Sequence, residues 1–312
     1  MESILSCIQV YLAPAIRGET ATKFEQLSLV LSRAASRNNS AKAAVESAIY
    51  DAVGKSFDVP ASQFLGGRVH DSFEVIWALA SGDVDQEIEE ARGKLARREH
   101  RRFKVKLGFK PPQEDLARLA RLVEALPGCE FIVDVNQAWT PAKAQRWMPA
   151  LAELGVALIE QPLPADDMDG LAHVTKCSRV PVMIDEGAFS NAEIARAGQL
   201  GAGNVLSLKL VKSGGLMHMK RAAAIARAHG MELYGGCLLE SGVGAAAHLA
   251  VFSTLPELHW GTEHFGPKIL VTDTTLGEIV YHDFNIHCPG GAGLGVSLND
   301  DLVRDCSRTV WA

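Results

Sequence analysis

Short apolar segments typical of buried β-strands recur through the chain, with helical segments between them. They lie at residues 72–80, 102–108, 130–137, 157–162, 181–186, 205–211, 231–237 and 259–265. Regular alternation of strands and helices is typical of parallel strands joined by crossover connections. Eight such units in a chain of 312 residues favour a TIM-like α/β barrel.

The segments outside the strands support this interpretation. Residues 112–126 and 215–230 carry apolar residues at helical spacing, and the second segment ends at Gly230, as a helix with a glycine cap would. Residues 38–57 are typical of an amphipathic helix, with Ser40 as its expected N-cap. Residues 270–298 indicate turns and short strands outside the barrel.

Composition excludes several classes of protein. A hydrophobic content of 47% with 22% charged residues is typical of a packed domain, and the formal net charge is −6. The one basic cluster, residues 97–102, is too short to predict a nucleic-acid partner. Six cysteines without a CxxC pair argue against zinc held by sulfur and favour reduced thiols. We find no export signal and no membrane span, and therefore expect a cytoplasmic protein.

Three carboxylates stand at the ends of consecutive predicted strands. They are Asp134, Glu160 and Asp185, with Glu186 directly after the last of them. Chemistry in a barrel of this kind lies at the C-terminal strand ends, so these acids should face one mouth. Their mutual repulsion and all-oxygen character predict a hard divalent cation such as Mg²⁺ or Mn²⁺. The alternative is that each acid caps a helix or forms a local ion pair.

Lysines accompany the acids. Lys104 and Lys106 share one face of a predicted strand, while Lys209 and Lys212 follow a strand farther along, so we expect Lys209 to face Lys106 across the mouth. A lysine beside another cation and a metal has a lowered pKa, which suits proton transfer near neutral pH. The alternative is that these lysines extend from strand ends into water.

The motifs KVK, DVN, IEQP, IDE and LKLVKSGG resemble, in order and spacing, the strand-end motifs of the enolase superfamily, and within it the muconate lactonizing enzyme subgroup. The segments YGGCLLESGVG and WGTEHFGP resemble muconate and chloromuconate cycloisomerases in particular. The similarity extends over nearly the whole chain. It implies a TIM-like (β/α)7β barrel with an incomplete α+β capping domain made from the N-terminal helices and the C-terminal tail.

The resemblance also implies domains and roles. Residues 1–65 would be the helical remnant of the capping domain, 66–265 the barrel and 266–312 the capping tail. Asp134, Glu160 and Asp185 would bind Mn²⁺ or Mg²⁺, and Lys106 would be the general acid/base. Lys104 would be its electrostatic partner, Lys209 the lysine of the opposite face and Glu263 the acid of the eighth strand, unless Glu263 forms only a structural ion pair.

The implied reaction is the interconversion of cis,cis-muconate, or chloromuconate, and muconolactone through an enolate. The substrate would be a small dicarboxylate, and the protein would be a homo-oligomer. Family members begin with antiparallel strands and a mobile loop that closes over the site, whereas this sequence begins within what resembles the capping helices. We therefore expect those strands to be missing, with metal binding kept and turnover poor.

Two alternatives stay open at this stage. One is another reaction of the superfamily, such as N-acylamino acid or dipeptide racemisation or epimerisation, or o-succinylbenzoate synthesis, because lysines on both faces would also serve these. The other is a truncated homologue without catalytic activity. The segment WGTE differs from the aspartate-rich eighth strand of dipeptide epimerases, whereas the presence of every candidate catalytic residue opposes a non-catalytic protein.

Overall fold

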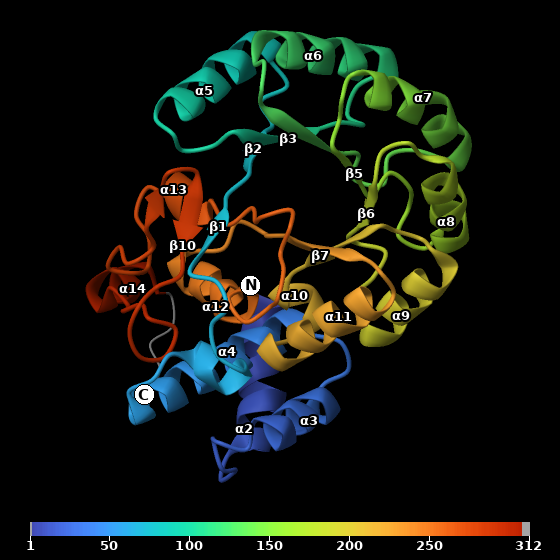
Figure 1. Cartoon of the computed structure of the whole chain (residues 1–312). Coiled ribbons are helices and arrows are strands. Elements are labelled where there is room, and N and C mark those ends of the chain that lie inside the picture. Colours follow the sequence, from blue (N-terminus) through green and yellow to red (C-terminus); the bar gives the residue numbers. More distant parts are fainter. Residues whose placement is uncertain (1, 308–312) are drawn as a thin grey trace.

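A curled parallel sheet lies at the centre of the chain, seen here in a computed structural model that describes residues 2–307 (Figure 1). Its strand order follows the chain without exchange. The strands are β2 (Trp77–Leu79), β3 (Arg102–Lys106), β4 (Glu130–Asp134), β5 (Leu158–Glu160), β6 (Val182–Ile184), β7 (Val205–Leu208) and β8 (Glu232–Gly235). The α/β class and the TIM-like barrel predicted from the sequence are confirmed.

The segment around Thr262 joins the two edges of this sheet. The Ile76 amide donates to the Thr262 carbonyl at 2.8 Å, and the Glu263 amide donates to the Gly235 carbonyl at 2.8 Å. The predicted eighth strand, residues 259–265, is thus present only as isolated bridges at Thr262. These bridges bring Glu263 to the same mouth as the ends of the other strands.

The first predicted strand, residues 72–80, is wrong as a single element. It consists of β1 (Ser72–Glu74) and β2, which belong to different sheets. β1 pairs antiparallel with β10 (Asn285–His287), which in turn pairs with β9 (Tyr281–His282). The chain changes sheets between Val75 and Ile76. The Val75 amide donates to the Phe284 carbonyl of the tail, whereas the next amide, that of Ile76, donates to the Thr262 carbonyl of the barrel.

Helices cover the outer face of the sheet (Figure 1). Several begin with side-chain caps, such as the reciprocal pair Ser190 and Glu193, which satisfies backbone amides at the start of one of them. The helices that connect or follow the barrel strands are α5 (Val84–Ala96), α6 (Pro112–Ala125), α7 (Pro141–Glu153), α8 (Met168–Cys177), α9 (Asn191–Leu200), α10 (Leu210–Ser213), α11 (Leu216–Ala228) and α12 (Gly242–Phe252).

The N-terminal segment is helical and packs beside the barrel near α10 and α11 (Figure 1). Its longest helix begins one residue after Asn38, so the expected N-cap at Ser40 is wrong and Ser40 lies in the first turn. The elements are α1 (Glu2–Cys7), a π-helical turn (Ile8–Leu12), α2 (Ala13–Ile16), α3 (Phe24–Ala34), α4 (Asn39–Phe57) and a 3-10 helix (Ala61–Leu65).

The C-terminal segment contains α13 (Gly266–Ile269), strands β9 and β10, and α14 (Asp300–Cys306). It lies beside β1, which connects the N-terminal helices to the barrel (Figure 1). The domain boundaries at 65 and 265 stay predictions. Over residues 2–307, no helix is both long and apolar enough to cross a membrane.

Candidate active site

The barrel interior contains a layer of buried apolar residues contributed by successive strands. Its members are Ile76, Ile132, Leu158, Met183, Val205 and Tyr234. Asp134, Glu160 and Asp185 stand two residues beyond members of this layer, and side chains two residues apart in a strand point to the same side. The strand period therefore directs all three carboxylates inward at the C-terminal mouth of the barrel, as the sequence predicted.

Lys104 is the centre of the first group of charges. Its side chain is 3% exposed, and its Nζ lies 2.8 Å from Glu263 Oε1 and 3.7 Å from Asp134 Oδ2. It also contacts Glu160 Oε2 directly. The parallel register places Lys104 beside Ile132, one layer below Asp134, which explains why the ammonium group is fully enclosed.

Lys106 lies nearer to the solvent than Lys104. Its side chain is 30% exposed, and its Nζ donates to Asp134 Oδ2 at 2.6 Å and to Asn136 Oδ1 at 3.0 Å. The register pairs Lys106 with Asp134 on the neighbouring strand. Of the two lysines of β3, Lys106 is therefore the more accessible to a molecule in the mouth.

The second group of charges surrounds Asp185. Lys209 donates to Asp185 Oδ2 at 2.5 Å, and Lys212 lies 2.8 Å from Asp185 Oδ1. Lys212 also donates to the Asp185 carbonyl at 2.8 Å. The structure thus brings every predicted site residue to one mouth, but arranges the acids as two lysine-paired groups.

The pKa values of these buried groups follow from their neighbours. Burial lowers the pKa of Lys104, but the charges of Glu160 and Glu263 outweigh burial and raise that pKa well above its usual value. Burial likewise opposes charge on Lys209, and Asp185 outweighs it, so the pKa of Lys209 is raised. Carboxylates rather than cations are the nearest neighbours of Lys104 and Lys209. The lowering expected from the sequence applies to a lysine beside a metal and stays a prediction.

Burial sets the direction of the pKa shift in two other groups, Lys212 and Glu160. Burial lowers the pKa of Lys212 despite the attraction of Asp185. Burial and the charge of Asp134 raise the pKa of Glu160 well above its usual value, although Lys104 opposes them. Burial also acts against ionisation of Asp185, but Lys212 and Lys209 hold its pKa well below the usual range.

The donor set at the mouth fits a hard divalent cation. Asp134, Glu160 and Asp185 supply only carboxylate oxygens, and all three side chains are buried. Glu160 Oε2 and Asp185 Oδ1 each face a lysine ammonium group, that of Lys104 and that of Lys212. Within the described part of the chain, oxygens of the three acids do not all lie within 4.8 Å of one another. An ion would therefore have to draw Asp134 and Asp185 from their lysines.

A cavity of about 590 Å³ opens onto these charges. Lys104, Lys106 and Lys209 reach it together with Asp134, Asp185 and Glu263. The remaining wall is mostly apolar and comes from Trp77 of β2 and from segments that follow the strands, including Phe189, Val211, Leu238, Phe265 and Ile269. Such a cavity can hold a small molecule that carries charge at one part and carbon chain at another.

Sequence reasoning missed two amides that hold the site residues in place. Asn136 donates its backbone amide to Asp134 Oδ1 at 2.9 Å and accepts from Lys106. Gln161 Oε1 accepts the amides of Asp185 at 2.9 Å and Gly187 at 3.1 Å. Both residues follow a strand-end acid by one or two positions, and this position is the signal in the sequence that could have drawn attention to them. Their positive φ values are visible only in the structure.

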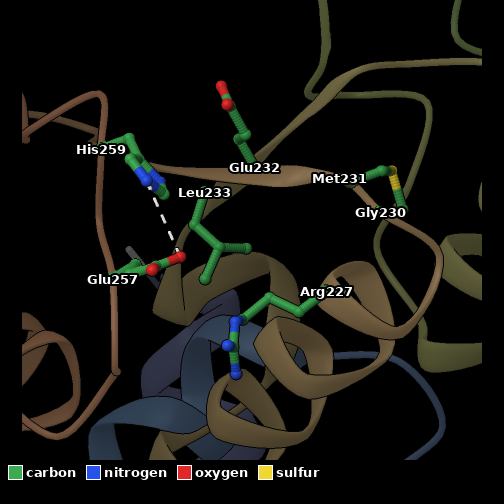
Figure 2. Close-up of a pocket in the computed structure, with 7 residues that line it drawn as sticks. All are labelled: Arg227, Gly230, Met231, Glu232, Leu233, Glu257 and His259. Atoms are coloured by element: carbon green, nitrogen blue, oxygen red, sulfur yellow. Dashed lines mark ion pairs between the residues drawn. The ribbon is translucent and has the colours of Figure 1, made fainter.

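Another cavity, of about 300 Å³, lies at the start of β8, the opposite end of the strand from the mouth (Figure 2). Met231, Glu232 and Leu233 line it together with Arg227. Its nearest charge pair is Glu257 with His259, at 3.7 Å, and both side chains are exposed. None of the predicted catalytic residues or metal ligands lines this cavity, so we assign the candidate active site to the mouth.

Comparisons with known proteins agree with this geometry. Residues 86–302 match the family described as enolase C-terminal domain-like, and residues 1–66 match the mandelate racemase/muconate lactonizing enzyme N-terminal domain. The chain is 40% identical to muconate cycloisomerase 1-2 of Acinetobacter lwoffii, over 98% of this chain and 80% of that protein. It is 36% identical to a chloromuconate cycloisomerase of Pseudomonas putida, over 98% and 83% of the two chains.

A solved structure shows the same arrangement. The muconate lactonizing enzyme of Pseudomonas fluorescens, complexed with muconolactone, superposes with a TM-score of 0.95 at 39% identity, over 97% of this chain and 82% of that one. An enolase-like barrel is therefore shared in sequence and in fold. The chain belongs to the mandelate racemase/muconate lactonizing enzyme family of the enolase superfamily.

Proposed function

We propose that this protein is a cycloisomerase that interconverts cis,cis-muconate, or a chlorinated muconate, and muconolactone. The observation that carries the proposal is the mouth cavity, in which Lys106 and Lys209 line the same space as an apolar wall. A linear dicarboxylate carries charge at its two ends and a carbon chain between them, so it matches a cavity lined by lysines and an apolar wall. The identity to muconate and chloromuconate cycloisomerases over nearly the whole chain supports this choice of substrate.

Lys106 is the proposed proton donor to the substrate carbon, and the acceptor of that proton in the reverse direction. Its ammonium group lies at the cavity, and its side chain is more exposed than that of Lys104 or Lys209. Asn136 and Asp134 fix its position by accepting its hydrogen bonds. A general acid needs this combination of access to the substrate and a fixed orientation.

Lys104 and Glu263 set the charge around the site and do not transfer the proton themselves. Lys104 is enclosed by Glu160, Glu263 and Asp134, so it stays protonated and contributes a fixed positive charge beneath Lys106. Lys209 occupies the other side of the cavity and offers a second positive charge to a substrate carboxylate. Fixed charges in a site that excludes water stabilise the negative charge that develops during the reaction.

Asp134, Glu160 and Asp185 are the proposed ligands of a divalent cation, Mg²⁺ or Mn²⁺. When bound, the cation would supply positive charge to a substrate carboxylate as negative charge develops there. The proposal is supported by the buried all-carboxylate donor set and by membership of the enolase superfamily. Gln161 would keep Asp185 in place, since its side-chain oxygen accepts the Asp185 amide.

Loss of the ultraviolet absorbance of cis,cis-muconate, measured with Mn²⁺ or Mg²⁺ present, tests the function directly. We expect turnover in the parent chain and its loss in Lys106→Ala, while Lys110→Ala serves as a matched control from an exposed lysine nearby. Failure to convert any muconate, together with racemisation of an N-acylamino acid, would replace this function with the alternative one. Homo-oligomer formation and a cytoplasmic location also stay predictions, the first open to size-exclusion chromatography.

A further inference from the structure

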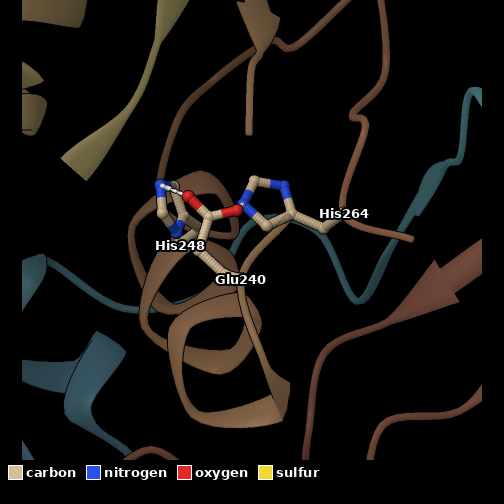
Figure 3. A group of neighbouring side chains, drawn as sticks. All are labelled: Glu240, His248 and His264. Carbon is tan, nitrogen blue, oxygen red and sulfur yellow. Dashed lines mark ion pairs between the residues drawn. The ribbon is translucent and has the colours of Figure 1, made fainter. Parts of the chain in front are cut away.

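Glu240, His248 and His264 converge near the end of β8, apart from the carboxylates of the proposed cation site (Figure 3). His248 Nε2 lies 3.9 Å from Glu240 Oε1, and His264 Nε2 lies 3.8 Å from Glu240 Oε2. Both imidazoles are at least 99% buried, and the Glu240 side chain is 13% exposed. Over the described residues, this is the one group of three whose ligand atoms all lie within 4.8 Å of one another.

The hydrogen bonds of His264 assign its tautomer. The Thr262 hydroxyl donates to the Gly235 carbonyl at 3.0 Å, so its oxygen accepts from His264 Nδ1 at 2.6 Å. The proton of the neutral imidazole is therefore on Nδ1, and Nε2 carries a lone pair. That nitrogen is buried without a hydrogen-bond partner and points toward the Glu240 carboxylate (Figure 3).

His248 is held in the same tautomer. The Leu210 amide donates to His248 Nε2 at 2.9 Å, and Nδ1 lies 2.8 Å from the Gly244 carbonyl, to which it donates. Burial lowers the pKa of both imidazoles, which keeps them in the neutral form that ligates metals. His264 Nε2, which has no hydrogen-bond donor, thus faces the Glu240 carboxylate. The lone pair of His248 Nε2 accepts the Leu210 amide, and the Glu240 oxygens accept the Leu238 amide.

Acceptors that face one another in a buried place repel unless a donor or a cation lies between them. We propose that Glu240, His248 and His264 bind a divalent transition-metal ion of the Zn²⁺ type. Imidazole with one carboxylate is a zinc ligand set, and ligands about 2.0–2.2 Å from a tetrahedral ion stand roughly 3.3 Å apart. The observed separations of 3.8 and 3.9 Å need only a small closure.

The three ligands contribute unequally to this site. His264 Nε2 is free of hydrogen bonds, whereas Glu240 would share its oxygens with the Leu238 amide and His248 would exchange the Leu210 amide for the ion. An ion can enter from a cavity of about 420 Å³ that Glu240 and His248 line. Imidazole nitrogen favours Zn²⁺, Ni²⁺ or Cu²⁺ over the Mg²⁺ that suits the strand-end carboxylates, so the two sites should select different metals.

The test uses the full chain with excess Mg²⁺, to which Zn²⁺ is added. Crystals measured on both sides of the zinc absorption edge should show an anomalous peak between Glu240, His248 and His264. An ordered water or empty density there, or zinc confined to Asp134, Glu160 and Asp185, would overturn the proposal. This result does not depend on turnover of muconate, so it separates the failure of this site from the failure of the proposed function.

Calorimetry in the same buffer gives a second readout. Glu240→Gln keeps an oxygen for the Leu238 amide but loses the negative charge. It should weaken Zn²⁺ binding at least roughly tenfold, because removing even a residue that only hydrogen-bonds to a metal ligand has an effect of that size. His264→Leu should do the same. His259→Gln, at an exposed residue outside both sites, is the control that should bind Zn²⁺ as the parent does. Unchanged affinity in a folded Glu240→Gln protein would count against the site.

Discussion

Lys106 Nζ donates a hydrogen bond to Asp134 Oδ2 at 2.6 Å, so the proposed proton donor and a proposed cation ligand are in direct contact. If a cation binds Asp134 as proposed, its binding and the orientation of Lys106 would be coupled through this side chain. Asn136, which accepts from the same ammonium group at 3.0 Å, offers Lys106 a second anchor when Asp134 turns away.

Removal of the Lys106 ammonium group should abolish proton transfer without removing the cation ligands. Lys106→Ala should reduce turnover by about 10²–10⁴-fold, the usual contribution of a general acid or base. Deuterium incorporation from heavy water into muconolactone measures the transfer itself. Lys104→Ala should retain some incorporation, because Lys104 is buried beneath the site. Full incorporation in Lys106→Ala would assign the proton to Lys209 instead.

Neutralising Glu160 should weaken the proposed cation site. Glu160→Gln keeps the size of the side chain but removes a charged oxygen ligand, so Mn²⁺ affinity measured by calorimetry should fall by at least roughly tenfold. Glu124→Gln, on an exposed part of α6, is the matched control and should bind Mn²⁺ as the parent does. Equal Mn²⁺ affinity in parent and Glu160→Gln would show that the ligand assignment is wrong.

The sequence predicted the strand-end acids well because a strand has a fixed period of two. Once Ile132 and Leu158 are assigned to the interior, Asp134 and Glu160 must share their side of the sheet. The period of two puts Lys104 and Lys106 on the same side of the strand, but it does not say which of them is buried. That distinction requires the depth of each residue layer below the mouth. Depth depends on the stagger between neighbouring strands, which no single strand carries in its sequence.

Contacts made through loops could not be predicted in this way. Gln161 reaches the Asp185 amide because its backbone has a positive φ, a conformation that glutamine rarely adopts. The meeting of His248 and His264 depends on how α12 packs against the segment that closes the barrel. The division of residues 72–80 into two strands likewise depends on the tail, which is more than 200 residues away in sequence.

A buried ion pair between α5 and α6 contacts the C-terminal end of β3. Arg118 Nη1 lies 2.8 Å from Glu87 Oε1, both side chains are buried, and Arg118 also donates to the Lys106 carbonyl. Glu87→Ala would leave a buried guanidinium group without its partner, so the free energy of unfolding should fall by about 3–5 kcal/mol. Urea denaturation measures this loss.

The same two helices provide the control for that experiment. Asp85 and Arg121 also pair α5 with α6, at 2.5 Å, but both side chains are more than half exposed. Asp85→Ala should therefore cost no more than about 1 kcal/mol. Equal losses in Glu87→Ala and Asp85→Ala would mean that burial of the inner pair has no energetic consequence.

Glu46 is a buried acid of α4 outside the active site. Burial raises its pKa from the ordinary 4.5 to about 7, although the backbone amides of Leu216 and Met217 and the charge of Arg221 oppose the shift. Glu25 is the nearby acid that adds to it. Because the folded state binds this proton more tightly than the unfolded chain does, Glu46 affects the pH dependence of stability.

The sign of that effect follows from the raised pKa of Glu46. Its contribution to stability is fully present below pH 4.5 and is lost as the pH rises to about 7, a loss of roughly 3 kcal/mol. Glu46→Gln cannot ionise, so it should match the parent near pH 4 and exceed its free energy of unfolding by up to that amount at pH 8. Urea denaturation across this range, with Glu124→Gln as an exposed control, measures the difference. A constant difference between parent and Glu46→Gln at every pH would show that Glu46 does not titrate in this window.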